Sequence, residues 1–224
     1  MKTFTLDELK QEAKQFSVLE SQHYEPDLYG VDNGKSIGTY IEHKFQNYLR
    51  KQGYNFKLGN SANGIDLPEL NVDIKVTSIR QPQSSCPFRS ARQKIYGLGY
   101  HILLFVYQKN DNSQLKVSTL KIHRSVFIHA DHTADYQLTS ALQYIINNHG
   151  NIDDLMACLM DRNLPVDEIG ARTLAEEIYH KHPKQGFLTI SNALQWRLQY
   201  TRAIQLSEDE VGLECLHKDD HITE

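Results

Sequence analysis

The sequence has few cysteines and no long apolar segment. Its three cysteines are odd in number and far apart, with no C-x-x-C pair, which argues against a disulfide framework and against a cysteine zinc site. No run approaches the roughly 18 apolar residues of a membrane span, and the N-terminal segment MKTFTLDELKQEAKQF is charged and amphipathic, unlike a signal peptide. We therefore expect a soluble, cytoplasmic protein.

Acidic residues are almost missing from one long segment. The chain of 224 residues has a net charge of -4, but residues 74–130 hold nine Lys and Arg against the single acid Asp111, which gives +8. Residues 178–207 hold four basic residues and no acid. Clustered Lys and Arg release counterions when they bind phosphates, so this distribution favours a nucleic-acid partner. A solvated basic surface is the alternative.

The segment GIDLPELNVDIKVTS, residues 64–78, carries the most informative pattern. Its second half predicts a strand with alternating apolar residues, at Val72, Ile74 and Val76. Asp73 and Lys75 then point the same way, and a turn containing Pro68 brings Asp66 back toward them. Two carboxylates beside an ammonium form a site for a hard divalent cation. An ordinary edge strand with a solvated Asp and Lys is the alternative.

The pattern around this hairpin predicts a particular order of elements. We expect a helix over 36–52, strands near 54–58, 64–67 and 71–79, a helix near 88–98 and a strand near 100–108. This order, together with Asp66, Asp73 and Lys75, resembles the PD-(D/E)xK nuclease superfamily. The proline that often precedes the first Asp is absent here. The resemblance implies an α/β fold, a restriction-endonuclease-like core with a mixed central sheet flanked by helices, plus a C-terminal helical module.

Glu42 is a further candidate on the helix predicted for residues 36–52. Helical spacing gives this helix a buried stripe, formed by Ile37, Ile41, Phe45, Tyr48 and Leu49. Glu42 lies at the boundary of the stripe, where its carboxylate could reach a metal above the sheet. The alternative is an exposed surface Glu. Members of the superfamily often carry such a residue, so the resemblance favours the functional interpretation.

The resemblance implies a type II restriction endonuclease, similar to the mismatch-repair nicking endonucleases, that hydrolyses double-stranded DNA at a specific sequence. It implies four catalytic residues, namely Asp66, Asp73, Lys75 and Glu42. The expected cofactor is Mg²⁺, which Mn²⁺ can replace, held by the carboxylates of Asp66, Asp73 and Glu42 and by the carbonyl of Ile74. A strand-nicking repair endonuclease and a non-catalytic DNA-binding protein are the alternatives.

We expect three consecutive segments. Residues 1–35 form an N-terminal helical lead-in, residues 36–150 the catalytic core, and residues 151–224 a helical module that resembles a helix-turn-helix. The helices of the last segment are expected near 152–162, 167–181 and 189–206. On the last helix a polar row could contact bases, formed by Gln195, Gln199 and Arg202.

Other DNA contacts are expected just after the hairpin. The loop QPQSSCP could enter a groove, and Arg89 and Arg92 are suited to clamp phosphates. The full set expected here is Arg80, Gln83, Arg89, Arg92 and Gln93. Cutting both strands of a palindromic site needs two active sites, so we expect a homodimer, and host DNA needs protection by a cognate DNA methyltransferase.

Overall fold

The computed structural model describes residues 4–59, 65–86, 89–192, 196–206 and 209–219. The chain forms two compact units that are not consecutive in sequence. Unit 1 comprises Met1–Pro82, Ile102–Ile128 and Leu206–Glu224, and unit 2 comprises Gln83–His101 and His129–Gln205. The proposed division into a lead-in, a catalytic core and a DNA-binding module stays a prediction.

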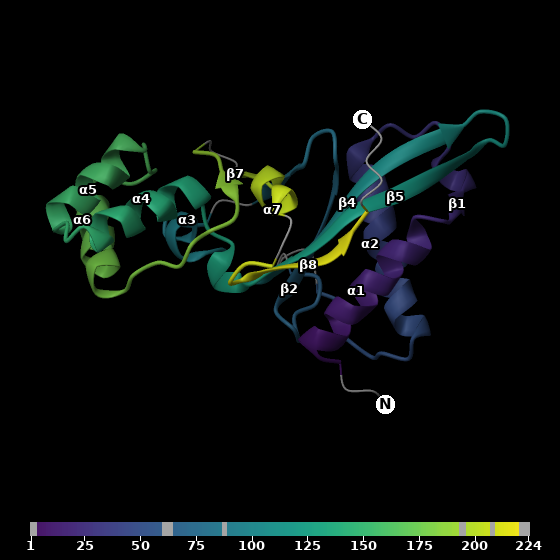
Figure 1. The fold of residues 1–224 in the computed structure, drawn as a ribbon, viewed down its shortest axis with the longest axis horizontal. Helices are drawn as coiled ribbons and strands as arrows, with labels where there is room; N and C mark the ends of the chain where they lie inside the picture. The colour runs from purple at the N-terminus through teal and green to yellow at the C-terminus, as the bar shows by residue number, and fades with distance from the viewer. Residues whose placement is uncertain (1–3, 60–64, 87–88, 193–195, 207–208, 220–224) are drawn as a thin grey trace. The chain divides into compact units, whose positions relative to one another are not determined.

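Unit 1 is built on a five-stranded sheet (Figure 1). Its strand order is β1-β5-β4-β2, and β8 also pairs with β5. The helices and strands are α1 (Leu6–Glu20), β1 (Tyr24–Glu25), the 3-10 helix η1 (Pro26–Leu28), α2 (Gly34–Lys51), β2 (Val72–Ser78), β4 (His101–Asn112), β5 (Val117–Ile128) and β8 (Leu213–Lys218). The predicted fold class, an α/β core with a central mixed sheet flanked by helices, is confirmed.

Helix α2 forms where the sequence predicts it. The side chain of Asn33 caps its first turn by accepting hydrogen bonds from the amides of Lys35 and Ser36. The predicted apolar stripe is buried and packs in one core with the strands and with α1, through Ile37, Ile41, Phe45 and Leu49 of α2 and Leu9, Ala13 and Phe16 of α1. Helix α2 lies on β2, and α1 lies on β5 and β8. The first 35 residues therefore contribute to the main core.

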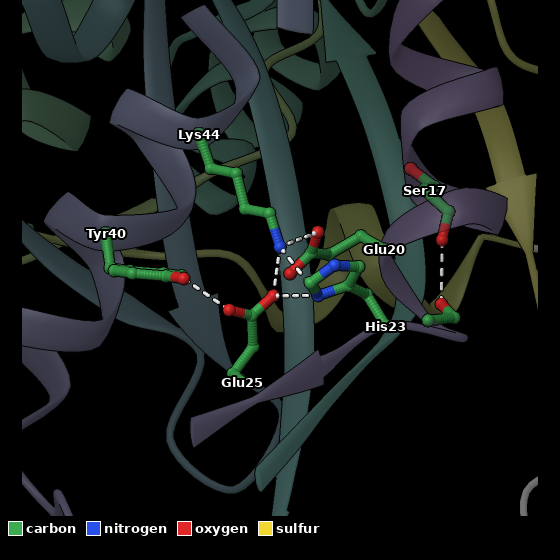
Figure 2. A network of polar contacts seen from close by, with 7 residues as sticks. Ser17, Glu20, His23, Glu25, Tyr40 and Lys44 are labelled. Carbon is green, nitrogen blue, oxygen red and sulfur yellow. Dashed lines mark hydrogen bonds and ion pairs between the residues drawn. The ribbon is translucent and has the colours of Figure 1, made fainter. Parts of the chain in front are cut away.

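A network of buried charges joins α1, β1 and α2 (Figure 2). The ammonium of Lys44 lies between two carboxylates, 2.9 Å from Glu20 Oε2 and in direct contact with Glu25. Tyr40 donates a hydrogen bond to Glu25, and the ring of His23 lies 2.7 Å from the same carboxylate. Although burial acts to raise it, the pKa of Glu25 is lowered by Lys44 and Tyr40, whereas burial raises the pKa of Glu20. These contacts hold α2 in place against its neighbours.

Unit 2 combines a helical cluster with a small antiparallel sheet of order β3-β7-β6. Its elements are β3 (Gln83–Cys86), α3 (Gln93–Tyr96), the 3-10 helix η2 (Ala130–His132), α4 (Tyr136–Asn147), α5 (Ile152–Asp161), α6 (Glu168–His180), β6 (Thr189–Ile190), β7 (Trp196–Gln199) and α7 (Thr201–Gln205). The helices predicted near 152–162 and 167–181 are confirmed as α5 and α6. They pack with α4 around apolar side chains such as Leu142, Leu155, Leu159, Leu174 and Ile178.

The helix predicted over residues 189–206 is wrong. In its place the chain forms β6, β7 and the short helix α7. Within β7 the buried Leu198 lies between the exposed Arg197 and Gln199, which is the alternation of a strand. The pairing of β7 with β3 supplies backbone hydrogen bonds from a segment more than a hundred residues away, a contact that local periodicity does not report.

Three smaller predictions are also corrected. The strand expected at 54–58 does not form, and the helix expected at 88–98 is described only as α3, Gln93–Tyr96. It ends at Gly97, whose φ of 91° and close approach to the carbonyl of Ala130 exclude a side chain. The QPQSSCP segment, expected as a loop, contains the strand β3.

Candidate active site

The predicted hairpin closes between Leu67 and Val72, which exchange two backbone hydrogen bonds of 2.9 and 3.2 Å. Asn71 in the turn adopts φ 54°, a conformation that Asn tolerates better than most residues. The amide of Gly59 also donates to the carbonyl of Asp66. The side chain of Asp66 then accepts a 2.7 Å hydrogen bond from the amide of Ile74. This bond fixes Asp66 against strand β2, near Asp73 as predicted, but the strand expected at 64–67 is reduced in residues 65–67 to an isolated bridge at Leu67.

Asp73 and Lys75 project from the same side of β2, and Lys75 Nζ lies 2.7 Å from Asp73 Oδ2. The prediction that they share a face is confirmed. Asp73 is not solvated, however, because it is only 2% exposed. Burial raises the pKa of Asp73 to about 7, and Asp66 adds to the rise. The Lys75 ammonium lowers the pKa but offsets these effects only in part.

Glu42 reaches the same place from helix α2. Burial and the negative charge of Asp66 raise the pKa of Glu42 to about 7, while Lys75 acts in the opposite direction. Gln46, one helical turn later, donates a 3.3 Å hydrogen bond to the Glu42 carboxylate. Gln46 is not among the site residues predicted from the sequence, although its i+4 spacing from Glu42 is a signal that could have identified it.

Glu42, Asp66, Asp73 and Lys75 are called here the carboxylate cluster. Its oxygens are the hard ligands that Mg²⁺ and Mn²⁺ prefer. Oδ2 of Asp73 is shielded from water, and the Lys75 ammonium 2.7 Å away is not aligned to donate a good hydrogen bond to it. A cation would satisfy this oxygen and reduce the repulsion between the carboxylates. Within the described ranges no three acidic, His or Cys side chains are already arranged as a metal centre. The carboxylate cluster fits a divalent cation whose binding releases the protons of the carboxyl groups.

The residues expected to contact DNA after the hairpin lie in different surroundings. Arg80, in unit 1, and Arg89, in unit 2, are exposed. Arg92 is engaged by Glu177, with both carboxylate oxygens 3.0 Å from its Nε, and lies over the ring of Tyr96. The other two expected residues, Gln83 and Gln93, lie in β3 and at the start of α3.

The polar row expected on a last helix does not exist, because no helix spans it. Gln195 lies outside the described residues. Gln199 belongs to β7, and Arg202 belongs to α7, where its guanidinium stacks 3.6 Å from the ring centre of Tyr136. Sequence analysis missed Arg197, which precedes Gln199 by two positions and lies on the same face of the strand.

An α/β sheet with a cluster of carboxylates and a lysine is the arrangement expected of a DNA-cleaving restriction endonuclease. Comparison with known proteins agrees. The family model of the type II restriction enzyme NspV matches residues 3–215. The type II restriction enzyme NspV of Nostoc sp. (strain ATCC 29411 / PCC 7524) is 57% identical over 218 residues, which cover 97% of this chain and 99% of the relative. No solved structure shows a significant match.

The chain belongs to the NspV family of type II restriction enzymes. It is a type II site-specific deoxyribonuclease, so the predicted function is confirmed over a nicking repair enzyme or a non-catalytic DNA-binding protein. Enzymes of this type generally need a divalent metal ion and act on DNA within restriction-modification systems. None of the described helices combines the length and apolar character needed to cross a membrane.

Proposed function

We propose that the carboxylate cluster is the active site and that Mg²⁺ is the cation it uses, with Mn²⁺ able to replace it. The observation that carries the proposal is the convergence of three carboxyl groups and one ammonium from α2, the hairpin and β2, two of the carboxyls having a pKa raised to about 7. Such shifts are typical of catalytic groups.

Each residue has a distinct role in this proposal. Asp66, Asp73 and the carbonyl of Ile74 would hold the cation, and Glu42 would complete the ligand set from α2. When bound, the cation would supply activation of the attacking water and stabilisation of negative charge on the phosphate. Lys75 would orient the water as an ammonium, or, as the neutral amine after losing its proton, would accept the water proton and become the ammonium. The ammonium's positive charge would stabilise the phosphate as a fifth oxygen approaches. The hydrogen bond from Ile74 to Asp66 keeps this carboxylate in place through the reaction.

The test is cleavage of supercoiled plasmid with Mg²⁺. We expect linear product from the wild-type enzyme, and loss of cleavage in Asp73→Asn and Lys75→Ala with DNA binding retained within about tenfold, because both changes affect the chemistry more than the phosphate contacts. Ca²⁺ should support binding but little cleavage, since its larger and looser coordination sphere positions the water poorly.

Lys57→Ala is the matched control, because Lys57 is an exposed lysine of unit 1 outside the cluster. It should cleave as the wild type does. If both cluster variants kept more than about a tenth of the wild-type cleavage rate, the active site would lie elsewhere. Undiminished cleavage in excess chelator would exclude the metal.

We also propose that the enzyme acts as a homodimer in the cytoplasm, where its DNA substrate is found. One carboxylate cluster lies in the described part of the chain, and cutting both strands of a symmetric duplex site needs two active sites. A cognate methyltransferase that protects the host DNA is the expected genetic partner. The exposed Arg80 and Arg89 are proposed to hold phosphates.

A further inference from the structure

The small sheet of unit 2 brings polar side chains from the neighbouring strands β6 and β7 and from the distant strand β3 onto one face. In the antiparallel register Gln83 lies opposite Gln199, which in turn lies opposite Thr189. Ser85 lies opposite Arg197. Directly paired residues project from the same side of a sheet, and so do residues two apart on one strand. These five side chains, called here the polar sheet face, therefore lie together.

Burial shows which side of the sheet faces solvent. On the polar sheet face Ser85, Thr189, Arg197 and Gln199 are exposed and Gln83 is half-buried. The opposite side is packed against the rest of unit 2. Its members are the buried Cys86, Ile190 and Leu198, and Ser84, whose hydroxyl lies 2.6 Å from the hydroxyl of the buried Tyr200. The small sheet thus has one buried side and one polar side that faces solvent.

Two side chains of the polar sheet face, Arg197 and Gln199, can donate hydrogen bonds to a ligand. Among the described residues the side chains of Arg197 and Gln199 have no hydrogen-bond or ion-pair partner, whereas Arg92 is paired with Glu177. The segments that supply the sheet are also free of negative charge, because residues 83–101 and 181–205 contain no Asp or Glu. A polyanion can approach this face without meeting a carboxylate from its own segments.

We propose that the polar sheet face contacts base edges in the major groove of DNA and supplies part of the sequence specificity; this rests on the DNA-cleaving activity and on the proposed use of Mg²⁺. The major groove admits a β-ribbon as well as a helix. The amides of Gln83 and Gln199 each combine a donor and an acceptor, which matches the N6 and N7 edge of adenine. The fork of Arg197 matches the O6 and N7 edge of guanine.

The test is cleavage of a random-sequence duplex library with Mg²⁺, followed by sequencing of the cut ends. The wild-type enzyme defines the preferred site. In Gln199→Ala and Arg197→Ala we expect the preference at one base pair to fall roughly 5- to 150-fold, while preferences at the other positions persist. Arg172→Ala and Gln114→Ala, exposed residues outside this face, are matched controls and should keep the wild-type preferences.

Arg197→Lys separates base recognition from phosphate binding. It keeps the positive charge but loses the two-pronged geometry, so it should lose preference for one base pair while binding to random DNA and its salt dependence stay unchanged. Arg197 would contact a phosphate if Arg197→Lys kept the base preference and Arg197→Ala bound all duplexes more weakly by the same factor. This result would overturn the proposal for Arg197. Thermal unfolding identifies any variant that fails to fold. If Arg197→Ala fails to fold, the base preferences of Gln199→Ala and Arg197→Lys test the proposal.

Two results would overturn the proposal as a whole in distinguishable ways. A wild-type enzyme that cuts the library at one site, together with variants that keep its full preferences, would place base recognition elsewhere and leave the active site untouched. A wild-type enzyme that leaves every duplex intact with Mg²⁺ or Mn²⁺ would contradict the cleavage activity on which the proposal rests.

Discussion

Burial and the neighbouring Lys75 ammonium have opposite effects on the ionisation of the Asp73 side chain. Burial disfavours its ionised form, and the single ammonium of Lys75 does not restore the usual carboxyl pKa, which rises to about 7. In the absence of metal the carboxyl therefore keeps its proton through the weakly acidic range. Metal binding requires the carboxylate, so cation affinity and proton release are coupled at this residue.

The pH dependence of stability tests this residue. A carboxyl whose pKa is higher in the folded state binds a proton on folding, so its contribution to stability is present at low pH and is lost as pH rises toward about 7. In excess chelator we expect the free energy of unfolding to fall from about pH 4 to about pH 7 and then to level off, so that it is lower at pH 8 than at pH 5. Asp73→Asn mimics the protonated form and should be more stable than the wild type at pH 8 by roughly 1–3 kcal/mol.

Urea unfolding at both pH values measures the effect. Asp161→Asn, at an exposed position, is the control and should follow the wild-type curve. If Asp73→Asn proved less stable than the wild type at both pH values, the ionised carboxylate would be a stabilising group.

Helix α2 connects two charged regions of unit 1 at the scale of elements. One region is the carboxylate cluster, reached by Glu42, and the other is the network of Figure 2, in which Lys44 neutralises Glu20 and Glu25. Both glutamates are only 2% exposed. Removing the ammonium takes away the cation that Glu20 and Glu25 share and leaves Glu25 with Tyr40 and His23 only, which costs more than an exposed ion pair contributes.

We therefore expect Lys44→Met to lower the free energy of unfolding by about 3–5 kcal/mol at neutral pH, because methionine replaces the aliphatic stem but not the charge. A second substitution, Glu20→Gln, should recover part of the loss. Urea unfolding measures both variants, with Lys51→Met at the exposed end of α2 as the control. A loss below about 1 kcal/mol would mean that water already solvates these carboxylates.

At the scale of the whole molecule, each subunit of the proposed homodimer cuts one of the two DNA strands. Mixed dimers of wild-type enzyme and Lys75→Ala contain one competent site each, so they should convert supercoiled plasmid to open circles. We expect open-circle product to increase as the variant is added in excess under conditions that allow subunits to exchange. Sedimentation of the free enzyme should give twice the chain mass. A monomeric mass, with linear product unaffected by the variant, would contradict the dimer.

Local sequence signals determined several parts of this protein. The 3.6-residue spacing of Ile37, Ile41, Phe45 and Leu49 predicts α2, because an amphipathic stripe needs only its own helix to form. The hairpin with Asp66, Asp73 and Lys75 follows from alternation and from a turn of a few residues, both of which are short-range properties. The resemblance built on these residues led to the class of enzyme that the family comparison supports.

Tertiary structure alone decided the rest. Residues 196–199 form a strand because β3 offers them backbone partners, and a helix there would leave β3 unpaired. The burial of Asp73 and the approach of Glu42 to Asp66 depend on how α2 packs on β2. The polar sheet face joins Gln83 to Gln199 across more than a hundred residues. Such long-range pairings have no local period, so periodicity within one segment cannot predict them.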